Sequence, residues 1–323
     1  MQTKQYADSV IAETEKIIIG KTDTIRLVLT AIFSGGHVLL EDLPGSGKTT
    51  LVKTLALALG CEMRRIQFTP DLLPADVTGM TVFNQKTGEF ELRMGPVSTN
   101  LLLADEINRA IPRTQAALLE AMEERQVTID GVSYALPDPF FVLATQNPVE
   151  KESTFPLPAA QMDRFFMKLS MGYPDAAEES RMLQNLGDRI PFEEVRPVTS
   201  PEILSSLKQE IAAVHLSDML RDYIVSLVQQ TRIHSAVKTG ASPRASRALF
   251  QGCKTLAAVN GRDFVTPEDI QKIAVPVLSH RIQLTAEARY GGTSPEDVLR
   301  RILADTPVPP AGSDRFPAGS RQA

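Results

Sequence analysis

The sequence predicts an α/β domain built on a parallel sheet, followed by a smaller all-helical domain. In the first half of the chain, short apolar runs alternate with helix-forming segments, which is the order that builds parallel sheets covered by helices. In the second half, the clearest signals are helix starts. The composition, with 43% hydrophobic and 23% charged residues in 323, is that of a globular protein with one large core or two moderate ones.

Three apolar runs in the first half have the character of strands buried on both faces. These runs cover residues 38–40, 101–104 and 140–144, and they lack the polar alternation of a half-exposed strand. Residues 48–59 have leucines at helical spacing, and residues 113–124 are rich in strong helix formers. We therefore expect strands and helices to alternate through this part of the chain.

Two further segments interrupt that alternation with the chemistry of β-hairpins. Residues 81–83 and 90–92 flank the polar stretch NQKTGE, and residues 126–129 and 132–136 flank Asp130-Gly131. Asp-Gly is favoured in the tight turns that join antiparallel strands. We expect both hairpins to be insertions into the α/β core.

The composition changes near residues 172–175. Beyond them, Ser200, Thr266 and Ser294 each precede a proline and acidic residues, which is a helix start signal. The expected organisation is an α/β core over residues 1–175, a bridging segment over 176–198 and a helical domain over 199–305. Residues 306–323 are rich in Pro and Gly and poor in large aliphatic residues, so they are expected to form a disordered tail.

Composition also argues against several classes of protein. Asp and Glu outnumber Lys and Arg by 39 to 34, for a net charge of −5, which disfavours sequence-independent binding to nucleic acid. Cys61 and Cys253 are the two cysteines, and they lack the spacing of a metal site or a disulfide framework. No signal peptide or membrane span is recognised, so the expected location is the cytoplasm.

The strongest functional signal is the segment EDLPGSGKTT, which lies between a predicted strand and a predicted helix. Glycines allow a backbone to approach phosphates closely, and amide groups at a helix N-terminus bind anions. Lys48 would reach the β- and γ-phosphates of ATP, and the Thr49 hydroxyl would ligate Mg²⁺. Asp42 replaces the glycine of the strict pattern, and the alternative is a plain strand–turn–helix connection. The expected ATP-binding residues here are Asp42, Leu43, Pro44, Gly45, Ser46, Gly47, Lys48, Thr49 and Thr50.

Polar residues follow the other two buried strands. Asp105 and Glu106 end the run LLLADE, and Asn147 follows residues 140–144 in ATQNP. In a parallel sheet these strand ends lie beside the phosphate segment. Asp105 would hold Mg²⁺ through water, Glu106 would act as general base, and Asn147 would orient the lytic water or contact the γ-phosphate. The alternatives are an acid pair at a helix N-terminus and a turn-forming asparagine.

Two arginines are candidates for stabilising the transferred phosphoryl group. Arg164 lies among apolar residues in QMDRFF, and Arg244 follows a proline in GASPRAS. Transition-state charge on the γ-phosphoryl group calls for an arginine from the same chain or another. The alternative for each is a guanidinium paired with a nearby carboxylate.

Taken in order, these motifs resemble a MoxR-family AAA+ ATPase. The resemblance rests on EDLPGSGKTT, LLLADEINRAIPRTQAALLEAMEERQVTIDG, ATQNPVEKESTFPLPAAQMDRF and GASPRAS, and it extends from about residue 18 to residue 280. It implies an AAA+ αβα core with a parallel sheet and two β-hairpin insertions, plus a smaller all-helical lid. One hairpin would interrupt the second core helix, and the other would precede the strand that leads to Asn147.

The resemblance also assigns roles to the candidate residues. Lys48 and Thr49 correspond to the Walker A pair, and Asp105 and Glu106 to the Walker B pair. Asn147 resembles sensor 1, Arg164 the arginine finger offered to a neighbouring subunit's ATP, and Arg244 sensor 2, acting in cis or in trans. The segment expected near the adenine comprises Ile18, Ile19 and Gly20.

For function, the resemblance implies Mg²⁺-dependent ATP hydrolysis in a ring, usually a hexamer. The hydrolysis would drive chaperone-like remodelling or assembly of protein complexes, including metalloenzymes, together with a separate adaptor that carries a von Willebrand factor A (VWA) domain. A magnesium-chelatase-like motor subunit is an alternative. A nucleic-acid motor is disfavoured because residues 81–93 balance Lys86 and Arg93 against two glutamates. A regulatory switch without turnover is disfavoured by the presence of Glu106.

Overall fold

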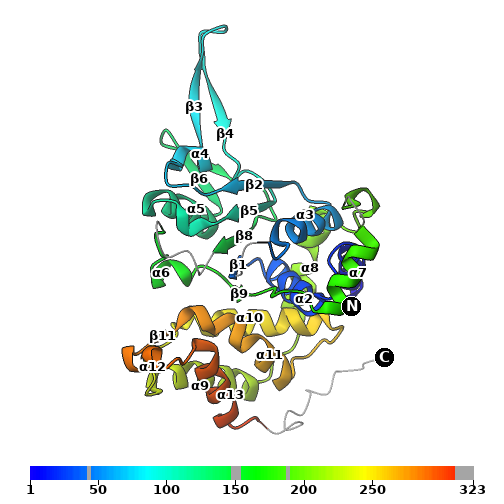
Figure 1. The fold of residues 1–323 in the computed structure, drawn as a ribbon, viewed down its shortest axis with the longest axis vertical. Coiled ribbons are helices and arrows are strands. Elements are labelled where there is room, and N and C mark those ends of the chain that lie inside the picture. Colours follow the sequence, from blue (N-terminus) through cyan, green and yellow to red (C-terminus); the bar gives the residue numbers. More distant parts are fainter. Residues whose placement is uncertain (42–44, 147–153, 187–189, 310–323) are drawn as a thin grey trace, which may run out of the picture. The chain divides into compact units, whose positions relative to one another are not determined.

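A five-stranded parallel sheet is the centre of the first of two units in the computed structural model, which describes residues 1–41, 45–146, 154–186 and 190–309. The units are Met1–Ala212 and Ala213–Ala323. The strand order is β2-β5-β8-β1-β9, and all neighbouring strands run parallel (Figure 1). The strands of this sheet are β1 (Val38–Glu41), β2 (Met63–Gln67), β5 (Leu101–Asp105), β8 (Phe141–Gln146) and β9 (Met167–Leu169).

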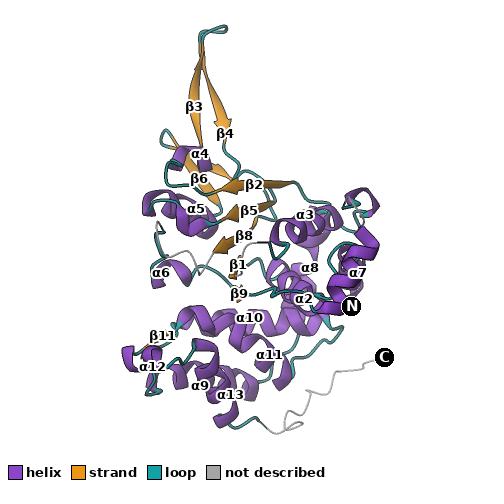
Figure 2. Ribbon diagram, in the orientation of Figure 1, coloured by secondary structure: helices purple, strands orange, loops and turns teal. Residues whose placement is uncertain are grey.

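Helices lie on both faces of this sheet (Figure 2). The predicted helices around residues 48–59 and 113–124 are confirmed as α3 and α5, and the three predicted strands as β1, β5 and β8. The α-helices of the first unit are α1 (Gln2–Glu15), α2 (Thr22–Phe33), α3 (Lys48–Leu59), α4 (Pro74–Thr78), α5 (Pro112–Glu124), α6 (Ala159–Met162), α7 (Ala176–Leu186) and α8 (Pro201–Ala213). Its short 3₁₀ turns are η1 (Ile107–Arg109) and η2 (Phe192–Glu194).

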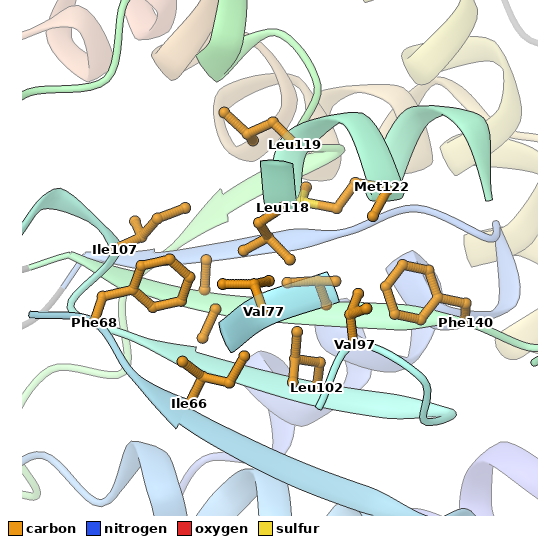
Figure 3. Close-up of a cluster of buried hydrophobic side chains, with 14 of the residues drawn as sticks. Ile66, Phe68, Val77, Val97, Leu102, Ile107, Leu118, Leu119, Met122 and Phe140 are labelled. Carbon is orange, nitrogen blue, oxygen red and sulfur yellow. The ribbon is translucent and has the colours of Figure 1, made fainter. Parts of the chain in front are cut away.

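One face of the sheet is closed by an apolar cluster beneath α5. Leu118 and Met122 of α5 pack over the strands beside Val77 and Phe140, and all four are at most 3% exposed (Figure 3). A buried Leu or Met side chain contributes about 1.5–3 kcal/mol through removal of apolar surface from water. This packing fixes α5, and with it the chain on either side of α5, against the sheet.

Both predicted hairpins are confirmed. β3 (Gly79–Asn84) pairs with β4 (Glu89–Met94), and β6 (Gln126–Ile129) pairs with β7 (Val132–Ala135), each pair antiparallel. The β3–β4 ribbon extends away from the sheet of the first unit (Figure 1). Asp130 and Gly131 both have positive φ, at 50° and 81°, as the predicted tight turn requires.

Two helices of the second unit, which start at Pro267 and Pro295, begin where the start signals predicted. Thr266 and Ser294 each form a reciprocal capping box with an aspartate three residues later. One small feature departs from the expectation of an all-helical domain. β10 (Val237–Thr239) and β11 (Gln283–Leu284) form a two-stranded sheet whose strands are too short for a sequence pattern. The helices are α9 (Asp218–Ile233), α10 (Pro243–Val259), α11 (Pro267–Leu278), η3 (Ser279–Arg281), α12 (Ala286–Tyr290) and α13 (Pro295–Asp305).

The division between the units does not coincide with the boundary expected near residue 199. Almost all of α8 belongs to the first unit, where Lys208 and Ser205 bond to Asp138 at 3.0 and 2.9 Å. Glu210 of α8 also accepts a hydrogen bond from the Thr3 hydroxyl at 2.6 Å. The assignment of core, bridging segment and lid by role stays a prediction, and most of the predicted tail lies outside the described residues.

Two other expectations concern cysteines and membranes. Cys61 and Cys253 are free thiols, in agreement with the absence of a disulfide framework. Within the described ranges, no helix has both the length and the apolar character needed to cross a bilayer.

A buried histidine joins three parts of the first unit. His37, next to β1, accepts a hydrogen bond at Nδ1 from the backbone N–H of Val142 at 3.0 Å, and its Nε2 lies 3.1 Å from the carbonyl oxygen of Met122. These partners require the neutral ring with its proton on Nε2. Burial, together with the nearby charge of Arg125, lowers the pKa of His37 to about 3.

This shift predicts that the free energy of unfolding decreases as the pH falls below about 6.5, the pKa of histidine in an unfolded chain. Below this pH, the His37 ring binds a proton in the unfolded state but stays neutral in the folded state. The free energy of unfolding therefore decreases by about 1.4 kcal/mol per pH unit until about pH 3. Urea denaturation at pH 7 and pH 5 checks this. The H37Q variant should be less stable at pH 7 but should lose about 2 kcal/mol less than the wild type on going to pH 5. Equal losses would contradict the assignment.

Candidate functional site

A cavity of about 450 Å³ opens where the parallel strands of the first unit end. Gln67, Asp105 and Gln146 are the last residues of β2, β5 and β8, and the carboxyl ends of neighbouring parallel strands meet at one edge of a sheet. Residues 45–50, which follow β1 in sequence, also line the cavity. The lining residues are Gly45, Ser46, Gly47, Lys48, Thr49, Thr50, Arg65, Gln67, Asp105, Glu106, Thr145 and Gln146.

The glycine turn forms one wall of this cavity. Gly45 and Gly47 both have φ of 81°, a left-handed conformation that favours glycine. A Cβ built on either residue meets no atom within 4 Å, so the backbone conformation, rather than crowding, calls for glycine. α3 begins at Lys48, so the amide groups of its first turn lie at the cavity. Asp42, Leu43 and Pro44 lie outside the described residues.

The two acidic residues also line the cavity. Asp105 ends β5 with only 9% of its surface exposed, and its Oδ2 accepts a hydrogen bond from Arg65 Nη2 at 2.7 Å. Glu106 Oε2 accepts from Gln67 Nε2 at 2.7 Å and from Arg109 Nη1 at 3.0 Å. Each carboxylate is thus oriented by named donors.

The backbone at Glu106 is unusual. Its φ and ψ are 55° and 50°, in the left-handed region that costs a residue with a side chain about 1–2 kcal/mol. Such strain persists only where surrounding contacts hold it, and it is found at functional sites. Here the Glu106 N–H donates to Thr145 Oγ1 at 2.8 Å, and Thr145 Oγ1 donates to Asp105 Oδ1 at 2.6 Å.

The structure brings four residues to the cavity that the sequence motifs did not identify. Arg65 and Gln67 were missed because β2, with the sequence MRRIQ, contains only two apolar residues and was not recognised as a strand. The local signal was a single alternation of polar Arg65, apolar Ile66 and polar Gln67, which is shorter than the roughly four to eight residues that indicate a strand. The two others, Thr145 and Gln146, are the last residues of β8. The next residue in sequence, Asn147, lies outside the described residues.

The donor set fits a magnesium ion and a polyphosphate. Thr49 and Asp105 supply the hydroxyl and carboxylate oxygens that Mg²⁺ prefers. Gln146 lines the cavity, and its buried Oε1 has no hydrogen-bond partner within the described part of the chain, which is uncommon for a buried polar atom. Lys48 and the start of α3 supply the positive potential that phosphates require.

Of the remaining sequence candidates, Arg164 and residues 18–20 belong to the first unit but are not among the residues that line this cavity. Arg164 Nε lies 2.8 Å from Glu123 Oε2 at the end of α5. In the single chain, Arg164 is therefore paired with a carboxylate, as the alternative in the sequence analysis stated. Arg244 lies in the second unit, in the first turn of α10. Ile18, Ile19 and Gly20 lie between α1 and α2, where Ile18 is buried.

Comparison with known proteins agrees with this geometry. Residues 37–167 match a model of the ATPase family associated with various cellular activities (AAA), and residues 229–302 match the AAA lid domain. Protein YeaC of Bacillus subtilis (strain 168) is 49% identical over 93% of this chain and 93% of its own length. Chaperone MoxR1 of Mycobacterium tuberculosis is 43% identical over 93% of this chain and 81% of its own. The crystal structure of a putative ATPase from Cytophaga hutchinsonii superposes with a TM-score of 0.90, at 41% identity over 96% of both chains.

Proposed function

Because the chain belongs to the MoxR family of AAA+ ATPases, we propose that it hydrolyses ATP with Mg²⁺ to remodel or assemble protein complexes. The observation that supports this most directly is the cavity that joins the glycine turn and the start of α3 to the Asp105–Glu106 pair. A helix N-terminus with a lysine binds phosphates, and adjacent carboxylates provide metal binding and a base.

In this proposal, the glycine turn and Lys48 hold the phosphates. The amide groups of residues 45–50 and the Lys48 ammonium group surround the β- and γ-phosphates. Thr49 would hold Mg²⁺ directly and Asp105 would hold it through water. The ion, when bound, neutralises charge on the phosphate oxygens. Residues 18–20 contact the adenine.

Glu106 is the proposed general base. Its carboxylate is exposed to the cavity but held by Gln67 and Arg109, so it is oriented before a substrate arrives. It accepts the proton of the water that attacks the γ-phosphorus atom, while the bond between that atom and the β–γ bridging oxygen breaks and ADP leaves. Asn147 orients that water or the γ-phosphate.

Arg164 and Arg244 complete the proposed site. Arg164 acts on the ATP of a neighbouring subunit, so the competent site lies at a subunit interface, and repeated head-to-tail contacts close into a ring, usually a hexamer. Glu123 holds Arg164 through a contact of 2.8 Å between Oε2 and Nε, and an arginine guanidinium suits recognition of phosphate oxygens. Arg244 acts as sensor 2.

The proposed client is a protein. MoxR1, with 43% identity, is named a chaperone. The β3–β4 ribbon exposes Phe83 and Phe90, which are 50% and 74% accessible and pack against each other at 5.2 Å. Exposed aromatic residues suit contact with apolar segments of a protein. A VWA-domain adaptor and metalloenzyme clients complete the proposal.

Arg164 provides the experiment that tests the ring. We expect R164A to bind ATP with unchanged affinity and to lose about 10³-fold in turnover, the usual scale for an arginine finger. Mixing it with K48A protein should restore part of the turnover, because each K48A subunit offers an intact Arg164 to the ATP of a neighbour. Phosphate release with Mg²⁺ is the measurement.

A matched control is R181A, which removes an exposed arginine of α7 in the same unit. It should keep wild-type turnover. Full activity of R164A would refute its assignment as arginine finger. Co-assembly of the two variants, verified by differently tagged subunits, without any recovered turnover would refute action in trans.

A further inference from the structure

We propose that Thr145 is the positioning residue that aligns both acidic residues of the site, a role that rests on the ATP hydrolysis proposed above. Thr145 lies on β8, the strand next to β5, and is far from Asp105 and Glu106 in the sequence. Its hydroxyl links the metal-binding carboxylate to the backbone of the general base. The linkage sets where each carboxylate points.

The hydrogen bonds define this linkage in both directions. Thr145 Oγ1 donates to Asp105 Oδ1 at 2.6 Å and accepts from the Glu106 N–H at 2.8 Å. A hydroxyl has a single proton to donate, so the bond to Asp105 fixes the rotation of that proton. Thr145 is 1% exposed, so water is poorly placed to substitute for it. One buried hydroxyl therefore has a defined partner on each acidic residue.

The bond to Glu106 holds a strained backbone. Glu106 has φ of 55°, and relaxation to an ordinary conformation would swing its side chain away from its present position between Gln67 and Arg109. The carbonyl oxygen of Glu106 is held on the other side by the N–H of Arg109 at 2.9 Å. Without the Thr145 hydroxyl, the Glu106 N–H loses the side-chain acceptor that opposes relaxation.

The bond to Asp105 acts on the second carboxylate. Asp105 is held at Oδ2 by Arg65 and at Oδ1 by Thr145. The Arg65 side chain is 48% exposed, and a half-exposed cation alone is a weak constraint on direction. Thr145 is thus the buried partner that fixes the plane of this carboxylate. Residues that orient a metal ligand typically change metal affinity or activity about 10- to 100-fold when removed.

A purely structural role would make a different prediction about valine. Valine has the shape of threonine and suits a buried strand equally well, and the preceding residues Leu143 and Ala144 are apolar and fully buried. If Thr145 only filled the sheet, T145V would be tolerated without a specific loss of function. If its hydroxyl positions the acids, T145V should impair turnover and T145S should preserve it.

The experiment measures Mg²⁺-dependent phosphate release by wild type, T145V and T145S. We expect T145V to lower kcat about 10- to 100-fold, the range for residues that orient a metal ligand, with little change in the KM for ATP. T145S should remain near the wild type. The control T114V removes another buried hydroxyl of the first unit, which donates to the Leu72 carbonyl at 2.6 Å. It should lower Tm without a specific change in kcat.

Ligand binding gives a second readout that does not depend on turnover. In the presence of EDTA, and therefore without Mg²⁺, a non-hydrolysable ATP analogue should raise the Tm of T145V as much as it raises the Tm of the wild type. The additional increase with Mg²⁺ should be smaller in T145V, because Asp105 is no longer oriented. T145S should retain this increment. If T145V does not fold, T145A replaces it, and binding of the analogue then confirms a folded site.

Two results would overturn the inference. A folded T145V or T145A protein whose kcat, and whose additional Tm increase with Mg²⁺, both equal those of the wild type would show that the hydroxyl positions neither acidic residue. A loss of kcat in T145S, which lacks the methyl group, without a loss in T145V, which retains it, would show that the methyl group, and not the hydroxyl, is responsible. Failure of the proposed function would look different, because the wild-type protein itself would then release no phosphate.

Discussion

Replacing Lys48 with alanine is expected to abolish detectable ATP binding. Lys48 begins α3 and lines the cavity beside the glycine turn. Its ammonium group is the charged side chain that this turn offers to the β- and γ-phosphates. A hydrogen bond to a charged group contributes about 1.5–3 kcal/mol, so affinity should fall about 10- to 150-fold from this bond alone. The loss of long-range attraction for a polyanion adds to this effect.

Titration calorimetry with ATP and Mg²⁺ measures the change directly. The matched control is K53A, which removes an exposed lysine from the same helix that does not line the cavity. K53A should bind ATP like the wild type. Unchanged affinity in a folded K48A protein would contradict the position of the phosphates in this cavity.

Replacing Glu106 with glutamine is expected to separate binding from hydrolysis. Glutamine has the size of glutamate but does not accept the proton of the attacking water. The loss of a general base typically slows a reaction about 10²- to 10⁴-fold. The glycine turn, Lys48 and Asp105 are unchanged, so ATP affinity should stay within about threefold of the wild type, a difference of less than about 0.7 kcal/mol. Phosphate release and ATP titration together test this.

The control for Glu106 is E120Q, which makes the same chemical change at an exposed position of α5 and should retain full turnover. Wild-type turnover in E106Q would remove Glu106 as the base. The stalled, ATP-bound form of E106Q is also the form in which an affinity purification would retain client and adaptor proteins. Their identity would define the physiological substrate.

Much of the core was predictable because its signals are local. The buried strands β1, β5 and β8 were recognisable as uninterrupted apolar runs, and Asp130-Gly131 specified a tight turn without reference to the rest of the chain. Helix starts at residues such as Thr266 depend on hydrogen bonds within four residues. Elements defined by neighbours in sequence can be inferred from sequence.

The strand β2 and the boundary at α8 were not predictable in this way. MRRIQ has few apolar residues, and its strand conformation comes from pairing with β5, in the register that places Gln67 beside Asp105. The position of α8 comes from contacts with residues far away in the sequence, including Asp138 and Thr3. No local pattern contains these partners.

At the site, the order of residues alone specifies which groups are available: a glycine turn, Lys48 and Thr49 before a helix, and two acids after a buried strand. How those groups are held follows from the folded chain. Strand order and register bring Gln67 to Glu106 and the Thr145 hydroxyl to both acids. The physical reason is that chemical identity belongs to each residue alone. The direction of a carboxylate, by contrast, depends on donors that only the pairing of distant strands brings within hydrogen-bonding distance.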